Sequence, residues 1–312
     1  MLRRNRKRPE EVFTPRSAQV NPTMYIPRPG LEASLRRGLG GSLHVVLHGD
    51  SGTGKTWLYK KVFADDGVEY EVSNLAIAAS LGGIREGLAQ TLASHGDAVK
   101  TGYSESQHAS ADAVVAKAGI GHVDTYAVGQ RDPFEAVLKR IRERAGRRPA
   151  ALVLDNLEAA FDNEGLLDEL ANLIILCDDE RYSAHAVQVI VVGVPSGLKE
   201  YFYKTPNRVT VANRLYELPE VSRLTESECA DLVRKGFVDE LGYSVDGLDA
   251  VTQHISWVTD RIPQKLHEYC LELAHIGYEA RSVSPTDLGV ADEAWLRGSM
   301  AYAHSAVEWH MH

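Results

Sequence analysis

The order of apolar and polar residues predicts strands that alternate with helices over the first two thirds of the chain. Short apolar or alternating runs are typical of strands, and they occur at residues 43–47, 68–72, 150–154, 187–194 and 214–218. Apolar residues at helical spacing indicate helices at residues 56–63, 81–92, 133–144 and 164–176. Strands that alternate with helices form a parallel sheet that is covered on both faces. The pattern therefore predicts an α/β fold.

The pattern changes near residue 223, where the predicted strands stop. The rest of the chain has helical spacing only, at residues 226–241, 248–258, 263–276 and 292–309. We therefore expect a sheet domain at residues 25–223 and a small all-α domain at residues 224–312. Within the sheet domain, residues 95–131 are rich in Gly, Ala, Ser, His and Asp, and we expect them to be an insertion.

Residues 1–24 contain a cluster of positive charge followed by two prolines. The residues concerned are Arg3, Arg4, Arg6, Lys7, Arg8, Pro15 and Pro22. Runs of like charge are usually solvated, so we expect a flexible basic arm. The same side chains could contact a phosphate backbone, which leaves DNA binding through the arm open.

Composition and charge narrow the class of protein. The chain has 312 residues, 44% hydrophobic and 25% charged, as is usual for globular proteins with a sizeable core. Its net charge of -9 excludes a general binder of polyanions, so any nucleic-acid contact must be local. The three cysteines form no CxxC pair, which argues against a disulfide or zinc scaffold and favours a cytoplasmic protein. We expect neither a membrane span nor a secretory signal, because no apolar run approaches ~20 residues.

A glycine-rich loop directly after the first predicted strand carries the strongest chemical signal. The pattern GxxxxGK[ST] is satisfied by Gly49, Asp50, Ser51, Gly52, Thr53, Gly54, Lys55 and Thr56. The glycines let backbone N–H groups turn toward a phosphate, and the following helix presents its positive end to it. In this motif the lysine reaches the β- and γ-phosphates, and the hydroxyl binds Mg²⁺. Because the loop lies between a predicted strand and a predicted helix, we expect a site for ATP and Mg²⁺.

A magnesium site needs a second anchor at the end of a neighbouring strand, and the stretch ALVLDNLE provides one. Asp155 follows four apolar residues there, and its carboxylate can hold Mg²⁺, usually through water. Hydrolysis also needs a group that orients or deprotonates water. The next residue, Asn156, cannot act as a base, and Glu158 is the nearest carboxylate. The sequence leaves open which of the two residues positions the water.

With both motifs in place, residues 25–276 resemble the AAA+ and STAND groups of P-loop ATPases. The stretch YIPRPGLEASL resembles the segment that opens many of these modules beside the adenine, which implies a base-binding role for Tyr25, Ile26 and Arg28. VIVVGVPSG resembles the fourth strand and its sensor-1 tip, which implies Ser196 as the polar group. Ser196 also fits a plain helix cap.

Two further stretches resemble later parts of AAA+ proteins. VANRLYELPEV resembles the box that carries the arginine finger, which implies this role for Arg214, with Arg208 as its competitor. DRIPQKLHEYCLELA resembles the Gly-x-Pro turn and the sensor-2 helix of a C-terminal lid, which implies that residues 224–312 form this lid. His267 on that helix stands beside Glu268, and we expect it to be solvated.

The sequence departs from the AAA+ pattern at three positions. Asn156 stands where Asp-Glu is usual, a form closer to STAND ATPases that hydrolyse slowly and act as switches. Arg261 replaces the glycine of Gly-x-Pro. Gln264 or Lys265 stands where a sensor-2 arginine is common, which puts that contact in doubt.

We therefore expect an ATP hydrolase with slow basal turnover that acts as a nucleotide-dependent switch or assembly module on a protein partner. If Arg214 acts across an interface, the site is complete only in a homo-oligomer. One alternative is an ATPase regulator of DNA transposition or replication. A second is a scaffold that binds ATP and barely hydrolyses it, which Asn156 favours. A small-molecule kinase with the same loop is disfavoured by the lid and by the Arg214 stretch.

Overall fold

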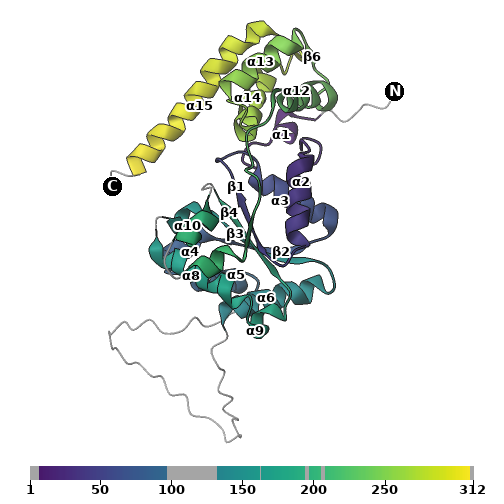
Figure 1. The fold of residues 1–312 in the computed structure, drawn as a ribbon. Helices are drawn as coiled ribbons and strands as arrows, with labels where there is room; N and C mark the ends of the chain where they lie inside the picture. The colour runs from purple at the N-terminus through teal and green to yellow at the C-terminus, as the bar shows by residue number, and fades with distance from the viewer. Residues whose placement is uncertain (1–6, 97–131, 162, 194–196, 205–207, 310–312) are drawn as a thin grey trace, which may run out of the picture.

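A computed structural model describes residues 7–96, 132–161, 163–193, 197–204 and 208–309, with residues 299–309 as backbone only. Within these residues a five-stranded parallel sheet has the order β2-β3-β4-β1-β5 (Figure 1). Its strands are β1 (His44–His48), β2 (Glu69–Asn74), β3 (Ala150–Asp155), β4 (Gln188–Gly193) and β5 (Leu215–Glu217). The parallel sheet confirms the predicted fold class.

The two faces of the sheet bury different side chains, because alternate residues of a strand point to opposite sides. Val45 and Leu47 of β1 join one apolar cluster with α2 (Pro29–Leu39) and α3 (Lys55–Asp66). Val46 joins a second cluster on the opposite face. The helices of that face are α4 (Leu75–Leu81), α5 (Ile84–Ser94), α6 (Pro133–Ala145), α7 (Glu158–Phe161), α8 (Glu164–Leu176), α9 (Glu180–Ser183), α10 (Leu198–Lys204) and α11 (Val209–Ala212).

The helix predicted at residues 81–92 is interrupted near its start. Gly82 has φ of 100°, ends α4 and is followed by the start of α5 at Ile84. The carboxylate of Glu169 accepts the N–H groups of Ile84 and Arg85 at 2.6 and 2.9 Å. A side chain from α8 therefore caps α5, which sequence spacing alone cannot predict.

Residues 224–295 form most of a third apolar core, separate from the two of the sheet. Its elements are α12 (Glu226–Arg234), the π-helix η1 (Lys235–Glu240), α13 (Leu248–Val258), α14 (Pro263–Ile276), the 3₁₀ helix η2 (Pro285–Asp287) and α15 (Leu288–Trp309). The expectation that strands stop after Leu224 is wrong, because β6 (Ser244–Val245) pairs with β7 (Ser282–Val283) in parallel. The pair joins two loops of the helical core. In the described part of the chain, none of the helices combines the length and apolarity needed to cross a bilayer.

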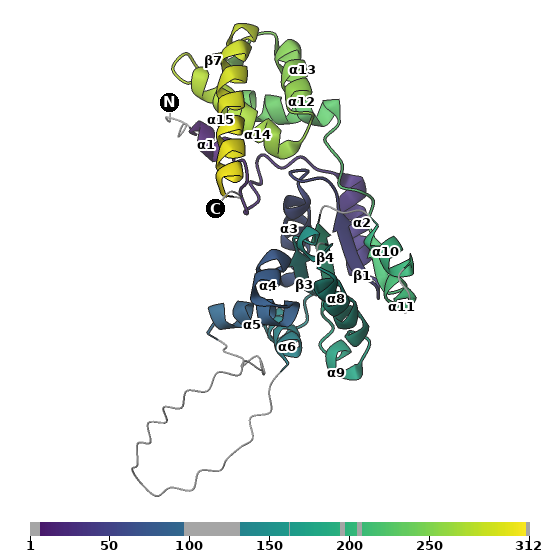
Figure 2. The same cartoon turned by 90° about the vertical axis from the view of Figure 1, so that its left-hand side faces the viewer.

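The N-terminal segment differs from the expected flexible arm. Residues 1–6 lie outside the described residues, but α1 (Pro9–Val12) packs beside α14 (Figure 2). Val12 and Phe13 are fully buried in the core of residues 224–309, and Met24 joins them. A Cβ atom at Gly236 would lie 2.3 Å from the Phe13 ring, so this glycine makes room for the ring. The apolar side chains, rather than the charges, determine where residues 9–24 lie.

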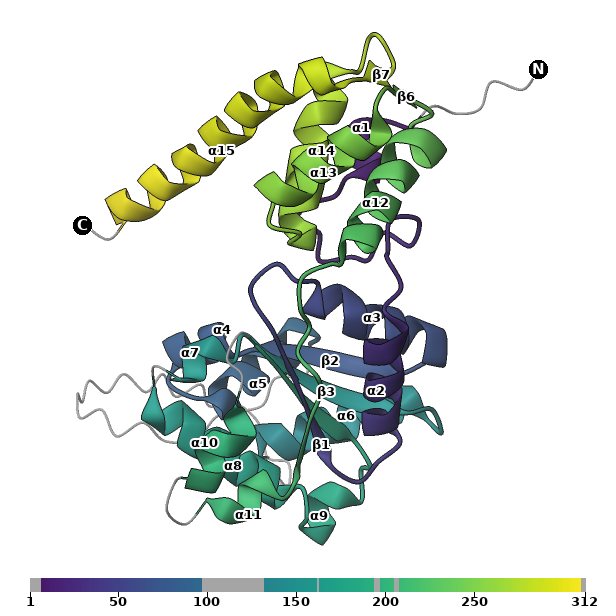
Figure 3. The ribbon, with the colours of Figure 1, turned by 45° about the horizontal axis from the view of Figure 1, so that its top comes forward.

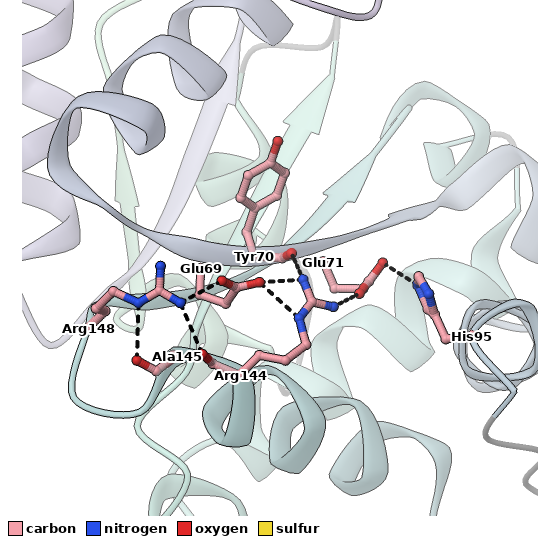
Figure 4. A network of polar contacts seen from close by, with 7 residues as sticks. All are labelled: Glu69, Tyr70, Glu71, His95, Arg144, Ala145 and Arg148. Carbon is pink, nitrogen blue, oxygen red and sulfur yellow. Dashed lines mark hydrogen bonds and ion pairs between the residues drawn. The ribbon is translucent and has the colours of Figure 1, made fainter.

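An ion-pair network covers the edge strand β2 (Figure 4). Arg144 of α6 donates to Glu69 at 2.9 Å and to Glu71 at 2.7 Å. Arg148 also donates to Glu69 at 2.9 Å, and His95 lies 3.0 Å from Glu71. Charged side chains on an edge strand oppose pairing with another chain.

Candidate nucleotide site

The predicted phosphate loop, residues 49–56 (the P-loop), follows the carboxyl end of β1. Its three glycines have backbone angles that side chains rarely adopt, with φ of 152° at Gly49, 78° at Gly52 and 94° at Gly54. A Cβ atom at Gly49 would lie 2.4 Å from the carbonyl oxygen of Val221. The first glycine is therefore needed for its conformation and for this close approach.

The apex of the P-loop rests on the start of α14. The N–H of Gln264 donates to the carbonyl oxygen of Gly52 at 3.2 Å, and a Cβ atom at Gly52 would lie 3.1 Å from the side chains of Ile262 and Gln264. Ser51 is exposed, whereas the buried Thr53 donates its hydroxyl to the carbonyl of Asp50 at 2.8 Å. The loop is thus held by the domain at residues 224–309 as well as by the sheet.

Lys55 and the start of α3 form a cradle that suits a phosphate group. The Lys55 ammonium donates to the carbonyl oxygens of Gly49 and Asp50 at 2.7 and 2.9 Å. Burial lowers the pKa of Lys55, while the nearby carboxylates of Glu158, Asp155 and Asp50 act in the opposite direction. The N-cap of α3 is Gly54, which offers no side-chain acceptor. The first N–H groups of α3 and the ammonium group can therefore bind an anion.

Asp155 ends β3 and, with Thr56, is the predicted ligand of a magnesium ion. The expected adjacency of its strand to β1 is wrong, because β4 lies between them. Asp155 nevertheless lies close enough to Lys55 for each to affect the pKa of the other. Burial raises the pKa of the Asp155 carboxyl, and Oδ1 accepts the N–H of Asn156 at 2.9 Å. Thr56 lies in the first turn of α3 and is half-buried.

The two candidates for positioning water differ in their surroundings. Asn156 has φ of 63°, a left-handed conformation that asparagine tolerates better than most residues. Glu158 begins α7, and a Cβ atom at Gly193 would lie 3.0 Å from its Oε2, so its carboxylate lies over the end of β4. Glu158 also acts electrostatically on both Lys55 and Asp155. The structure thus brings Glu158 to the centre of the candidate site.

The predicted base-binding residues line a small cavity between the sheet domain and the helical domain. Tyr25, Ile26 and Arg28 lie on one side of it, and Gly54 and Leu58 lie on another. The Tyr25 hydroxyl donates to Glu32 at 2.9 Å, and burial raises the pKa of Tyr25. Arg28 donates to the carbonyl of Ser222 at 3.0 Å, and burial lowers its pKa. The cavity is mainly apolar and lies directly beside the phosphate cradle, as a site for a nucleotide base does. Its volume is ≈ 40 Å³, so the two domains must move apart for a base to enter.

His267 also lines this cavity, and its expected solvation is wrong. The side chain is buried, and Nδ1 accepts the N–H of Thr14 at 3.1 Å. The ring meets the Trp57 indole edge-on, with centroids 5.5 Å apart. Burial lowers the pKa of His267 to about 4. The sequence does contain a signal for this burial. His267 lies three and seven residues before the buried Cys270 and Ala274, so the three share one face of the helix.

The two predicted arginines do not join the P-loop within one chain. The carbonyl of Arg214 accepts the N–H of His44, so Arg214 lies at the amino end of β1, opposite the P-loop. Its guanidinium donates to Asp178 at 2.6 Å. Arg208, the competitor, pairs with Asp168 of α8. Ser196 lies outside the described residues.

The segment that joins the two domains carries an ion-pair link that sequence reasoning missed. Arg223 lies 3.7 Å from Asp50 of the P-loop and also pairs with Asp260. Asp260 and Arg261 have φ of 52° and 57°, two consecutive left-handed residues directly before α14. The Arg261 carbonyl accepts the N–H of Leu224 at 3.0 Å. P-loop, connecting segment and helical domain are therefore linked by charge and by backbone.

This strand order, together with a P-loop between a buried strand and a helix, defines a P-loop nucleotide-binding protein. Residues 37–202, more than half of the chain, match the AAA domain family. The chain belongs to this family. The helical domain at residues 224–309 lies outside this match and is called the lid below, after the resemblance in its sequence.

Solved structures share this fold at low sequence identity. A Walker-type ATPase of Pyrococcus abyssi is 14% identical with a TM-score of 0.61, and the match covers 92% of this chain and 76% of that one. The ORC2 protein of Aeropyrum pernix in its ADP form is 15% identical with a TM-score of 0.60, covering 91% and 72%. RuvB of Thermotoga maritima is 14% identical with a TM-score of 0.51, covering 86% and 70%. A search of curated proteins finds no match.

Proposed function

We propose that this protein binds ATP with Mg²⁺ between its sheet domain and its lid, hydrolyses it slowly, and acts as a nucleotide-dependent switch on a partner. The observation that carries the proposal is the hydrogen bond from the Gln264 amide to the P-loop carbonyl of Gly52. A phosphate held by the P-loop changes the charge directly beneath the lid. The angle between the two domains can therefore follow the state of the nucleotide.

Each group at the sheet edge has a distinct role in this proposal. The Lys55 ammonium and the first N–H groups of α3 bind and orient the phosphates. Thr56 and Asp155 hold the metal ion. Glu158 orients the attacking water and accepts its proton, because its carboxylate lies over β4 near both Lys55 and Asp155. The magnesium ion, when bound, neutralises charge on the phosphates.

The base of the nucleotide occupies the cavity beside Tyr25, Ile26 and Arg28. Their contacts already join the two domains, since Lys235 of the lid donates to the carbonyl of Tyr25 at 3.2 Å. Base binding in this cavity would stabilise the N-terminal segment against the lid. The ADP form of the A. pernix ORC2 protein, which shares this fold, supports a nucleotide as the ligand.

Arg214 is proposed to act in a neighbouring subunit, because it lies opposite the P-loop in its own chain. An arginine finger contributes ~10³–10⁵ to the rate when it acts on hydrolysis. Mixing the Arg214→Ala and Lys55→Ala variants tests the role, since a mixed homo-oligomer contains sites with both residues intact. Failure to recover turnover at any mixing ratio would argue against action across an interface.

Calorimetry and phosphate release test the core of the proposal. Lys55→Ala should weaken ATP binding by about 10- to 100-fold, as expected for a lost charged hydrogen bond. Lys61→Ala is the matched control, because Lys61 lies on the same helix and pairs with Asp65. Equal ATP affinity of the Lys55→Ala variant and the wild type would refute the site.

The same assays separate the alternatives. Tight ATP binding without phosphate release would favour the scaffold. DNA binding that weakens with salt and is lost on deleting residues 1–6 would favour the transposition or replication regulator, with DNA as the partner. Phosphate release that increases on adding a protein partner is the result expected for the switch.

A further inference from the structure

An open groove lies on the lid and shares no lining residue with the proposed base cavity. It is formed by the start of α12, by α13 and by the turn before α14 (Figure 3). Trp257 of α13 borders it with 80% of its surface exposed, and no other large apolar side chain among the described residues is more exposed. A tryptophan so exposed on a well-packed helix adds nothing to the lid core and is typical of a binding surface.

The groove carries negative charge that the chain does not neutralise. Glu226 and Asp249 line it, and neither has an ion-pair partner among the described residues. Asp260 lines it as well but is already paired with Arg223. Arg261 is a cation at the end of the groove nearest the P-loop. Most of the groove is therefore acidic around one exposed indole.

A buried hydroxyl supplies an independent sign of a missing partner. Thr252 of α13 lines the groove and is only 8% exposed. Its Oγ1 has no hydrogen-bond partner in the described part of the chain. Buried polar atoms are normally satisfied, so this hydroxyl leaves a hydrogen bond unmade beside the groove.

We propose that this groove docks a basic segment of a protein partner. An arginine or lysine of the segment lies over the Trp257 indole, while neighbouring cations pair with Glu226 and Asp249. Nucleic acid does not fit this face, because its phosphates would meet the two carboxylates.

The position of the groove makes docking relevant to the P-loop. A basic segment competes with Arg223 for Asp260, and Arg223 is the residue that reaches Asp50 of the P-loop. Docking would therefore loosen the link between the connecting segment and the lid. This consequence rests on the nucleotide switch proposed above, whereas docking itself does not.

Binding of a fluorescein-labelled peptide rich in arginine and lysine to the full-length protein tests the docking surface. A glutamate-rich peptide of equal length is the control. The basic peptide should bind more tightly, and its binding should weaken as salt is raised. Trp257→Ala should reduce its affinity by ~3- to 30-fold, and the pair Glu226→Gln with Asp249→Asn should remove most of the salt dependence.

Matched variants on other faces should leave peptide binding unchanged. Tyr203→Ala removes an aromatic ring of α10 that is 64% exposed, and Glu293→Gln removes an exposed carboxylate of α15. Equal affinities for the two peptides, or equal effects of the groove and control variants, would overturn the proposal. Self-association that is lost both in Trp257→Ala and on deleting residues 1–6 would assign the groove to a second copy of this chain instead.

Failure of docking and failure of the nucleotide switch give different results. The Lys55→Ala variant should still bind the basic peptide, because docking does not need ATP. Peptide binding without any effect on phosphate release would leave the docking surface intact and refute its link to the P-loop. Loss of peptide binding in Lys55→Ala would refute docking at a site independent of nucleotide.

Discussion

The two sides of the candidate nucleotide site are built in different ways. On the sheet side, the P-loop, Asp155 and Glu158 each follow the end of a buried strand within a few residues. On the lid side, the contacts come from residues 12–28, 220–224 and 260–267, which are far apart in the sequence. Phosphate chemistry is thus encoded in short motifs. Coupling between the domains depends on contacts between distant segments.

The two sides also differ in the kind of packing that holds them. β1 and the first five residues of β3 are fully buried, and their apolar side chains alternate between two clusters. The lid side instead holds two consecutive left-handed non-glycine residues and depends on ion pairs of Arg223. Regular packing gives the sheet side rigidity, whereas the lid side depends on interactions that charge, pH and ligands can change.

The largest expected effect is a loss of ATP turnover on changing Glu158, on the sheet side of the site. Glu158→Gln should lower ATP turnover by about 10²–10⁴, the usual contribution of a general base, while ATP binding persists. Asn156→Asp should change turnover far less, because Glu158 rather than Asn156 is proposed to accept the proton. Single-turnover phosphate release measures both variants. A large loss in Asn156→Asp with normal turnover in Glu158→Gln would reverse the assignment of the two residues.

The next prediction concerns the apolar contact between the N-terminal segment and the lid. Phe13 is fully buried, and its ring centroid lies 5.0 Å from that of Phe237. Phe13→Ala should destabilise the lid by about 3–5 kcal/mol, as expected for truncating a buried aromatic ring. Gly236→Ala should act in the same direction, because its new methyl group would meet the Phe13 ring.

Urea unfolding followed by lid and sheet probes measures these two variants. We expect the lid to unfold at lower urea concentration while the sheet domain keeps its own transition. Unchanged lid stability in both variants would mean that residues 9–24 do not belong to the lid core. The lid would then not depend on a segment that is distant from it in the sequence.

A smaller effect should appear as pH dependence on the lid side. Burial holds the pKa of His267 at about 4, below its ordinary value of about 6.5. Between these values the unfolded chain binds more protons than the folded one, so stability falls as pH decreases. From pH 6.5 to pH 5 the loss should be about 1.5 kcal/mol.

His267→Asn tests this prediction, because an amide oxygen can still accept the Thr14 N–H but does not titrate. Urea unfolding at pH 7 and pH 5 should show a weaker pH dependence in this variant. His44 of the sheet domain also has a pKa lowered by burial to about 4, so His267→Asn should leave part of the dependence in place. An unchanged pH dependence would show that His267 is not buried in its neutral form.

The sequence predicts the sheet side well for a physical reason. Its strands are apolar runs, and the boundaries of α8 and α14 follow from helical spacing and from Asn163 and Pro263 at their starts. The lid side escapes prediction because no local pattern reveals which distant residues meet. Nothing near Phe13 indicates Gly236, and nothing near Asp50 indicates Arg223. Charge in residues 1–24 points toward a solvated arm, although three apolar side chains in that segment are buried in the lid.

The smallest expected effect concerns the backbone of the turn before α14. Arg261 has φ of 57°, which costs an ordinary residue about 1–2 kcal/mol relative to a right-handed conformation. Its backbone N–H donates a hydrogen bond to the carbonyl of Ser256, and its carbonyl accepts one from the N–H of Leu224. Its side chain makes no hydrogen bond among the described residues. Arg261→Gly relieves this strain, but glycine also gives the unfolded chain more conformational freedom, which offsets part of the gain. We therefore expect the protein to be stabilised by less than about 1 kcal/mol.

Arg281→Gly is the matched control, because Arg281 also has a left-handed backbone, with φ of 49°. Unlike Arg261, it donates to the carbonyl of Leu241 and lies over the Tyr243 ring, with 5.1 Å between guanidinium and centroid. Removing its side chain should therefore destabilise the lid, although the relief of backbone strain is the same. Thermal unfolding of the two variants should show a small increase for Arg261→Gly and a decrease for Arg281→Gly. A decrease of more than 1 kcal/mol for Arg261→Gly would mean that its side chain already contributes to folding, and the turn would then be part of the lid core.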